Sequence, residues 1–105
     1  MTLSELNTVL KSTGLPVAYG YFNEKNAPAL PCITYEVAYS NNFAAENQVY
    51  KKIQHVDIFL WTSKKDLAAE EALENALDSA FLVYQSTETY LSAEKAYQII
   101  YEVEI

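Results

Sequence analysis

The segment 56–66 constrains the fold more than any other, because a strand pattern passes directly into a helix start. Residues 56–61 read Val-Asp-Ile-Phe-Leu-Trp, and branched aliphatic side chains recur at every second position, which is the period of a β-strand. Ser63 precedes Asp66 at a capping-box-like spacing, in which the serine accepts from a free helix N–H and the acid complements the helix dipole. The Ala- and Leu-rich sequence that follows predicts a helix over residues 64–82.

The first residues predict a shorter helix over residues 3–12. Thr2 and Glu5 form a capping-box pattern, and the leucine and valine side chains after them share one face at helical spacing. Gly14 stands where a left-handed C-terminal cap belongs, and Pro16 prevents the helix from resuming. We expect the apolar face of this helix to pack into the core.

The remaining segments carry strand and turn signals. Alternating, β-branched or aromatic residues predict strands over 17–22, 32–40, 49–61, 87–91 and 96–105. In the second of these, one face is expected to carry Ile33, Tyr35, Val37 and Tyr39. The segment 41–47 is predicted to be a loop in a hairpin that projects beyond the compact body.

The element order is therefore α-β-β-β-α-β-β. It predicts a single α+β domain over residues 1–105, with an antiparallel β-sheet of 4–5 strands and two helices packed on one face. The strand 96–105 is expected inside the sheet, because a long apolar edge strand would invite aggregation.

The charge balance is one-sided, with 14 acidic residues against 7 lysines and no arginine, for a formal net charge of −7. Proteins that bind nucleic acid concentrate positive charge to neutralise phosphates, and anionic membranes attract the same charge. The composition therefore argues against stable binding to DNA, RNA or an anionic membrane. Solubility is the simpler explanation of the acid excess, and a surface that passes near nucleic acid without adhering is the sharper one.

Membrane and export signals are not expected either. No apolar run approaches the roughly 20 residues of a membrane-spanning helix, and no basic region precedes an apolar stretch at the N-terminus. Cys32 is the single cysteine, which makes an internal disulfide impossible and favours an intracellular protein.

Groups suited to catalysis or metal binding are sparse. Cys32 and the single histidine, His55, could form a thiolate pair, but nothing in the sequence brings them together, and a buried structural cysteine is the better interpretation. Two glycines cannot build a phosphate-binding loop. A solvated helix face, rather than a cation site, is the interpretation preferred for Glu70, Glu71, Glu74 and Asp78. We predict no enzymatic activity, no cofactor and no metal.

Aromatic residues leave two interpretations open. Tyrosine suits surfaces that are wet in the free protein and buried in a complex, but it also simply favours strands. The nine tyrosines are Tyr19, Tyr21, Tyr35, Tyr39, Tyr50, Tyr84, Tyr90, Tyr97 and Tyr101. Trp61 is a candidate for packing under the second helix or against a neighbouring subunit.

Three segments together resemble the tail-terminator and tail-completion proteins of long-tailed bacteriophages and prophages. They are Leu30-Pro31-Cys32-Ile33-Thr34-Tyr35-Glu36, then residues 55–63, and the Ala-rich residues 68–77. That family likewise pairs a proline-led strand with a long strand reading apolar-Asp-apolar, a polar break and an Ala-rich helix. Its size and element order agree with nearly the whole chain.

The resemblance implies a structural virion protein, located in the tail or neck and in the host cytoplasm during assembly. Such proteins form a ring, commonly a hexamer and in some cases only on assembly, that caps the head-proximal end of the tail tube. The implied partners are further copies of the chain, the tail tube protein and the head connector or neck protein. A subunit-contact loop is expected around Asn41, Asn42, Phe43, Glu46 and Tyr50.

Other functions remain as alternatives. The nearest is another neck or minor capsid protein of the same assembly module. A small-ligand-binding regulatory domain on a similar α+β scaffold is a second, since one fold hosts many functions. An enzyme that uses Cys32 and His55 is the third, and it lacks the supporting groups that such a site needs.

Overall fold

The computed structural model describes residues 1–23, 25, 27–40, 43–45 and 48–105, and for 43–45 and 48–51 the backbone alone. Two helices and seven strands follow one another as α1 (Leu3–Lys11), β1 (Val17–Tyr19), β2 (Cys32–Ser40), β3 (Phe43–Ala45), β4 (Gln48–Lys51), β5 (Gln54–Thr62), α2 (Leu67–Ser79), β6 (Tyr84–Leu91) and β7 (Ala96–Glu104). The predicted α+β fold class is confirmed.

Five of the strands form one sheet in the order β1-β2-β5-β7-β6, so that β7 lies inside the sheet as predicted. The pairs β2–β5, β5–β7 and β6–β7 are antiparallel, whereas β1 lies parallel to β2 with Val17 opposite Ile33. The sheet is therefore mixed rather than wholly antiparallel. A long connection, and not a tight turn, joins β1 to β2, which is what a parallel pair requires.

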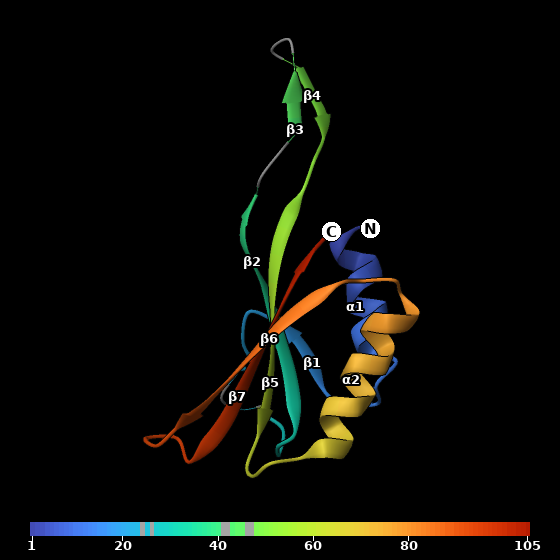
Figure 1. The fold of residues 1–105 in the computed structure, drawn as a ribbon. Coiled ribbons are helices and arrows are strands. Elements are labelled where there is room, and N and C mark those ends of the chain that lie inside the picture. Colours follow the sequence, from blue (N-terminus) through green and yellow to red (C-terminus); the bar gives the residue numbers. More distant parts are fainter. Residues whose placement is uncertain (24, 26, 41–42, 46–47) are drawn as a thin grey trace.

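Both helices cover one face of the sheet, which we call the helix face (Figure 1). Side chains from α1, α2, β2, β5 and β7 meet there in one core. That core contains Leu6, Leu10, Ile33, Tyr35, Val56, Ile58, Leu60, Ala69, Leu73, Leu77, Ile99, Tyr101 and Val103. The predicted alternation of β5 is confirmed, because Val56, Ile58 and Leu60 are fully buried.

The first helix begins as predicted. Thr2 Oγ1 accepts from the backbone N–H of Glu5 at 3.1 Å, and the Glu5 carboxylate reaches back to the Thr2 N–H, so the capping box is complete. Leu6 and Leu10 are fully buried, which confirms that this helix packs into the core. Gly14 adopts the expected left-handed conformation, with φ of 83°.

The second helix begins later than predicted. Asp66, not Ser63, is its N-cap, and the Asp66 carboxylate accepts from the N–H of Ala69 at 3.0 Å. Residues 63–65 precede the helix, and the Lys65 ammonium contacts the carboxylates of Glu70 and Glu88 at 3.0 and 2.8 Å. A helical start at residue 64 is therefore wrong, because the Asp66 carboxylate, three residues after Ser63, is the side chain that accepts from a free N–H of the first turn.

The helix α2 ends at Ser79, short of the predicted residue 82. Phe81 has φ of 59°, and the Leu82 N–H bonds to the carbonyl of Leu77 at 3.0 Å. This is the geometry of a Schellman C-cap, whose left-handed position normally carries glycine. Here a phenylalanine occupies it.

Strand boundaries also differ from the prediction. The predicted strand 49–61 divides into β4 and β5, and β3 lies within the predicted loop 41–47. β3 and β4 pair with each other as a separate two-stranded ribbon that continues β2 and β5 away from the body (Figure 1). The molecule is accordingly long, with extents of 49 × 27 × 24 Å. Among the described residues, no helix is long and apolar enough to cross a membrane.

A register shift in β2 redirects Tyr39. Val37 lies opposite Val56, and Tyr39 lies opposite the adjacent residue, His55, so β2 gains one residue relative to β5. Such a bulge turns the following side chains to the other face. The placement of Tyr39 on the face of Ile33 is therefore wrong. Its ring instead stacks on the His55 ring, with centroids 4.1 Å apart.

Candidate functional site

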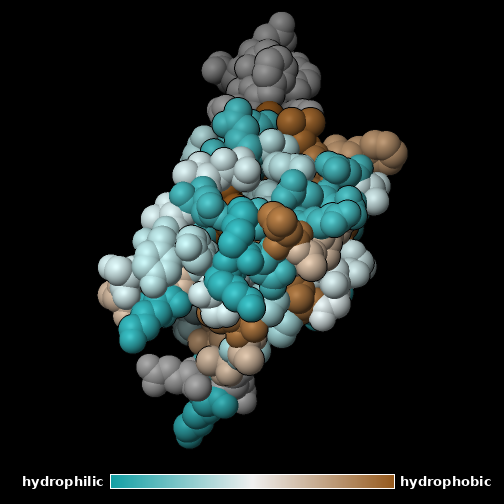
Figure 2. Space-filling view, turned by 60° about the horizontal axis from the view of Figure 1, so that its bottom comes forward, coloured by the Kyte–Doolittle hydropathy of each residue, from teal (hydrophilic) through white to brown (hydrophobic). Residues whose placement is uncertain are grey.

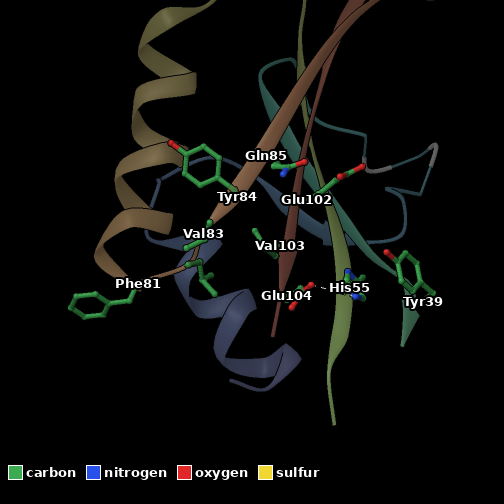
Figure 3. A pocket seen from close by; sticks show the side chains of 10 residues that line it. Tyr39, His55, Phe81, Val83, Tyr84, Gln85, Glu102, Val103 and Glu104 are labelled. Atoms are coloured by element: carbon green, nitrogen blue, oxygen red, sulfur yellow. Dashed lines mark ion pairs between the residues drawn. The ribbon is translucent and has the colours of Figure 1, made fainter. Parts of the chain in front are cut away.

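A hollow lies beside the base of the β3–β4 ribbon, where β5, β6, β7 and the end of α2 approach one another. It is open to solvent and has a volume of about 590 Å³. Its lining is formed by Tyr39, His55, Phe81, Leu82, Val83, Tyr84, Gln85, Glu102, Val103 and Glu104. Figure 3 shows His55, Glu104 and Tyr39 together at one side and Phe81 pointing away at the other.

The polar side of this hollow is a row of three groups. The Tyr39 and His55 rings stack at an interplanar angle of 17°, and His55 Nε2 lies 3.5 Å from Glu104 Oε1. Their positions follow from register, since Tyr39 and Glu104 flank His55 on β2 and β7. A protonated His55 would form an ion pair with Glu104. The described lining contains no Ser, Thr or Cys side chain.

Cys32 is remote from His55. Cys32 lies opposite Trp61 at one end of β5, whereas His55 stands near the other end, roughly 20 Å away at the usual rise per strand residue. The Cys32 side chain is buried, and burial raises the pKa of its thiol above the usual value. Cys32 therefore has the character of a structural core residue, and the thiolate pair considered from the sequence is not assembled.

Two hydrophobic side chains stand out from the α2–β6 connection. Phe81 is 94% exposed and Val83 is 88% exposed. In Figure 2, hydrophobic residues form separate patches among hydrophilic ones rather than one continuous surface. Exposed apolar groups next to an unpaired strand edge are a feature of contact surfaces. The apolar run Phe-Leu-Val at residues 81–83 was the only sequence sign of this exposed surface, and the sequence analysis did not identify it as a contact site.

The acids of α2 do not form a uniformly solvated face. Glu74 accepts hydrogen bonds from the hydroxyls of Tyr84 and Tyr101, and Glu70 pairs with Lys65. Glu71 and Asp78 are exposed. The solvated-face interpretation is therefore wrong for Glu70 and Glu74. Within the described ranges, no group of three or more His, Cys, Asp or Glu side chains is placed to hold a metal ion.

A second set of acids crosses the face of the sheet opposite the helices, which we call the open face. Glu36 lies directly opposite Asp57, and Asp57 lies directly opposite Glu102 on the next strand. We call these three residues the acid row. Among the described residues, no ion pair engages any of the three. Neighbouring like charges on a sheet are unfavourable, so the acid row is a local cost to the isolated chain.

Trp61 also lies on the open face, so it does not pack under α2. Its indole Nε1 donates to Thr34 Oγ1 at 2.9 Å, and Phe59 stacks beside it with centroids 6.0 Å apart. Residues of the connection after β1 share a smaller hollow with Trp61 and partly cover it.

The subunit-contact loop expected from the sequence falls only partly on described residues. Asn41, Asn42 and Glu46 lie outside the described residues. Phe43 is the first residue of β3, and Tyr50 lies in β4. The expected loop is thus carried by the ribbon, and the Tyr39–His55–Glu104 row stands at the base of that ribbon.

Comparison with known proteins adds no relative: no protein-family model matches this chain, and no curated protein matches it.

Proposed function

We propose that this chain is a structural virion protein that caps the head-proximal end of a phage tail tube as a ring. In this role the ring ends polymerisation of the tube and joins the tail to the head connector. The three sequence segments that resemble tail-terminator proteins motivate the proposal. It requires surfaces for contact with other subunits and does not require an active site.

The β3–β4 ribbon is the observation that carries this proposal. It pairs only within itself among the described strands and extends beyond the five-stranded sheet (Figure 1). A lone two-stranded ribbon is marginal in water, because it has no second layer on which to bury a face. A neighbouring subunit that covers the ribbon would supply that layer. Around a ring each ribbon would meet a different surface of the next copy, as a heterologous contact requires.

The charge of the chain fits the same role. A net charge of −7 would repel the phosphates of DNA that passes through the ring, so the genome would not adhere. The acid row on the open face is one place where this charge gathers. Imaging of the ring would give the arrangement of the subunits and so the surfaces that face the channel.

The direct test is a termination assay with a cognate phage tail tube protein. Tube subunits are polymerised alone and with increasing amounts of the full chain, and lengths are measured by negative-stain electron microscopy. Tubes that shorten with dose and carry a ring at one end are expected. Tubes of unchanged length with no ring on either end would overturn the proposal. Binding to the connector alone, with tubes unaffected, would instead favour another neck protein.

A hairpin-shortened variant tests the ribbon itself. Ser40 lies opposite Gln54, so residues 41–53 can be replaced by Asn-Gly, which forms a two-residue hairpin turn. We expect this variant to fold, with unchanged far-ultraviolet circular dichroism, and to lose tube termination. A matched control replaces residues 92–95, between Leu91 and Ala96, by the same turn. The control should fold and terminate tubes normally.

A further inference from the structure

The strand β6 is an unprotected edge of the sheet. It stands last in the strand order and pairs with β7 on one side. Residues 85–90 are all exposed, so nothing in the described part of the chain covers this edge. Alternate residues of such a strand direct their backbone N–H and C=O groups outward, where another strand can pair with them.

Protective devices are missing from β6 but present at the opposite edge. β6 runs from Tyr84 to Leu91 without a register shift, and its sequence contains no lysine or proline. Natural edges are commonly kept short, bulged or charged with lysine to prevent pairing. The opposite edge, β1, is only three residues long and directly follows Pro16. Of the two edges, β6 is therefore the one that remains open to pairing with another strand.

We propose that β6 pairs antiparallel with β6 of a second copy of this chain, across a two-fold axis that passes beside Thr87. The helix faces of both copies then lie on the same side of the joined sheet. Each residue of β6 therefore lies opposite a residue of the second copy whose number is the same or differs by an even number. Thr87 meets Thr87, and Gln85 meets Thr89 of the second copy. The ten-stranded sheet formed in this way leaves no long edge exposed.

Side-chain matching selects this register. Val83, which is 88% exposed, comes to lie opposite Leu91 of the second copy, and Phe81 lies just beyond that contact. On the helix face, the exposed ring of Tyr90 meets Tyr84 of the second copy. Glu88, whose carboxylate also pairs with Lys65, meets Ser86, whose hydroxyl can donate a hydrogen bond to that carboxylate. Every cross-strand pair is then apolar, aromatic or a polar match.

The neighbouring registers fit less well. An axis beside Glu88 sets two glutamates directly opposite each other, which is unfavourable for like charges. An axis beside Ser86 pairs Leu91 with Phe81, but it places the exposed Val83 opposite Thr89 and Tyr84 opposite the charged Glu88. The axis beside Thr87 therefore avoids both the Glu88–Glu88 pair and the mismatch of Val83 with a threonine.

This inference goes beyond the proposed function. A two-fold contact joins identical surfaces and closes after two copies, so it cannot by itself build a ring. The two-fold dimer is a state of the free chain, in which each copy shields the β6 edge of the other before assembly. A contact of one strand and two apolar side chains lies at the small end of protein interfaces, so a reversible dimer with a dissociation constant on the order of 10–100 μM is expected.

Variants that each carry one added cysteine test the register. Cys32 is buried, so the wild-type chain gives the background. Ser86→Cys, Thr87→Cys and Glu88→Cys are each treated with a short bifunctional thiol reagent. Only a residue opposite itself brings two Cβ atoms within about 5 Å, so Thr87→Cys should cross-link at least tenfold faster than the other two. The double variant Gln85→Cys/Thr89→Cys should cross-link, whereas Gln85→Cys alone should not, because two copies of residue 85 lie about 13 Å apart.

Sedimentation velocity of the full chain from about 5 to 500 μM gives the second measurement. We expect a monomer–dimer equilibrium that Thr87→Lys weakens at least tenfold, because two lysines would face each other at the axis. Thr89→Lys adds the same charge opposite Gln85 and should weaken the dimer less. A monomer at every concentration, or fastest cross-linking at residue 86 or 88, overturns the proposal. Tube termination would be unaffected by that result, so the two proposals fail separately.

Discussion

The phenolic hydroxyl of Tyr101 donates a hydrogen bond to Glu74 Oε2 at 2.9 Å and so ties β7 to α2. The hydroxyl of Tyr84 on β6 donates to the other carboxylate oxygen, Glu74 Oε1, at 3.2 Å. One charged acceptor thus satisfies two tyrosines that also contact each other edge to face, with ring centroids 5.4 Å apart. Tyr101 is 1% exposed, so its hydroxyl depends on this partner.

Removing Glu74 should therefore destabilise the fold. Glu74→Ala leaves the buried Tyr101 hydroxyl without an acceptor, and we expect a loss of about 1–3 kcal/mol in the free energy of unfolding. Urea unfolding followed by circular dichroism measures it. Glu71→Ala, at an exposed position of the same helix, should change stability by less than about 0.5 kcal/mol. Equal losses for the two variants would show that the hydroxyl contacts contribute nothing.

Alkaline pH should weaken the fold through Tyr101. Burial, and then the hydrogen bond to Glu74, raises the pKa of Tyr101 above its ordinary value of 10.0. Because the folded state holds this proton more tightly than the unfolded state, the stabilisation is fully present below pH 10 and is lost as pH rises above it. The free energy of unfolding of the wild-type chain should fall between pH 10 and 11.5. The free energy of unfolding of the Tyr101→Phe variant should fall less steeply over the same range. The exposed Tyr90→Phe is the control, and it should retain the wild-type slope.

The fold was predictable where local periodicity and the core agreed. Val56, Ile58 and Leu60 alternate in the sequence and are fully buried, and the Thr2–Glu5 capping box closes as expected. The direction of β1 and the bulge before Tyr39 were not predictable, because pairing between distant segments decides both. Sequence spacing carries no information on such non-local choices.

The candidate contact surfaces were predictable only in part. The hairpin at residues 41–47 was expected from its turn residues, and the structure carries it on the β3–β4 ribbon. Phe81 and Val83 were missed, since the predicted helix 64–82 extended over Phe81 and Leu82 and no contact was expected there. The helix ends at Ser79, and the left-handed Phe81 beyond its cap turns the chain toward the edge strand β6.

The start of α2 can be tested by its cap. Asp66 accepts from the Ala69 N–H, so Asp66→Ala should lower the free energy of unfolding by about 0.5–2 kcal/mol. Ser63→Ala, at the residue that the sequence pattern favoured, should change it by less than about 0.5 kcal/mol, because Ser63 precedes the helix and is exposed. Thermal unfolding of both variants decides between the two caps. A larger loss for Ser63→Ala would return the helix start to residue 64.

The contact between Trp61 and Thr34 should be visible in fluorescence. Trp61 is the single tryptophan, and its indole N–H donates to Thr34 Oγ1 at 2.9 Å. Thr34→Val keeps the shape but removes the acceptor, so we expect a loss of about 1–2 kcal/mol and a shift in the emission maximum. Thr89→Val changes an exposed threonine on β6 and should alter neither quantity. An unchanged emission spectrum for Thr34→Val would contradict the contact.

The acid row should make the isolated chain less stable at low salt. Asp57 lies between Glu36 and Glu102 on neighbouring strands, and among the described residues no ion pair offsets their charge. Asp57→Asn removes the central charge and should raise the free energy of unfolding by about 0.2–1 kcal/mol at low ionic strength. The gain should shrink toward zero near 1 M NaCl, where the Debye length falls to about 3 Å. Glu94→Gln removes the same charge from the exposed turn between β6 and β7 and should change stability little at either salt concentration. A loss of stability for Asp57→Asn would mean that the carboxylate has a favourable partner and that the acid row is not a site of repulsion.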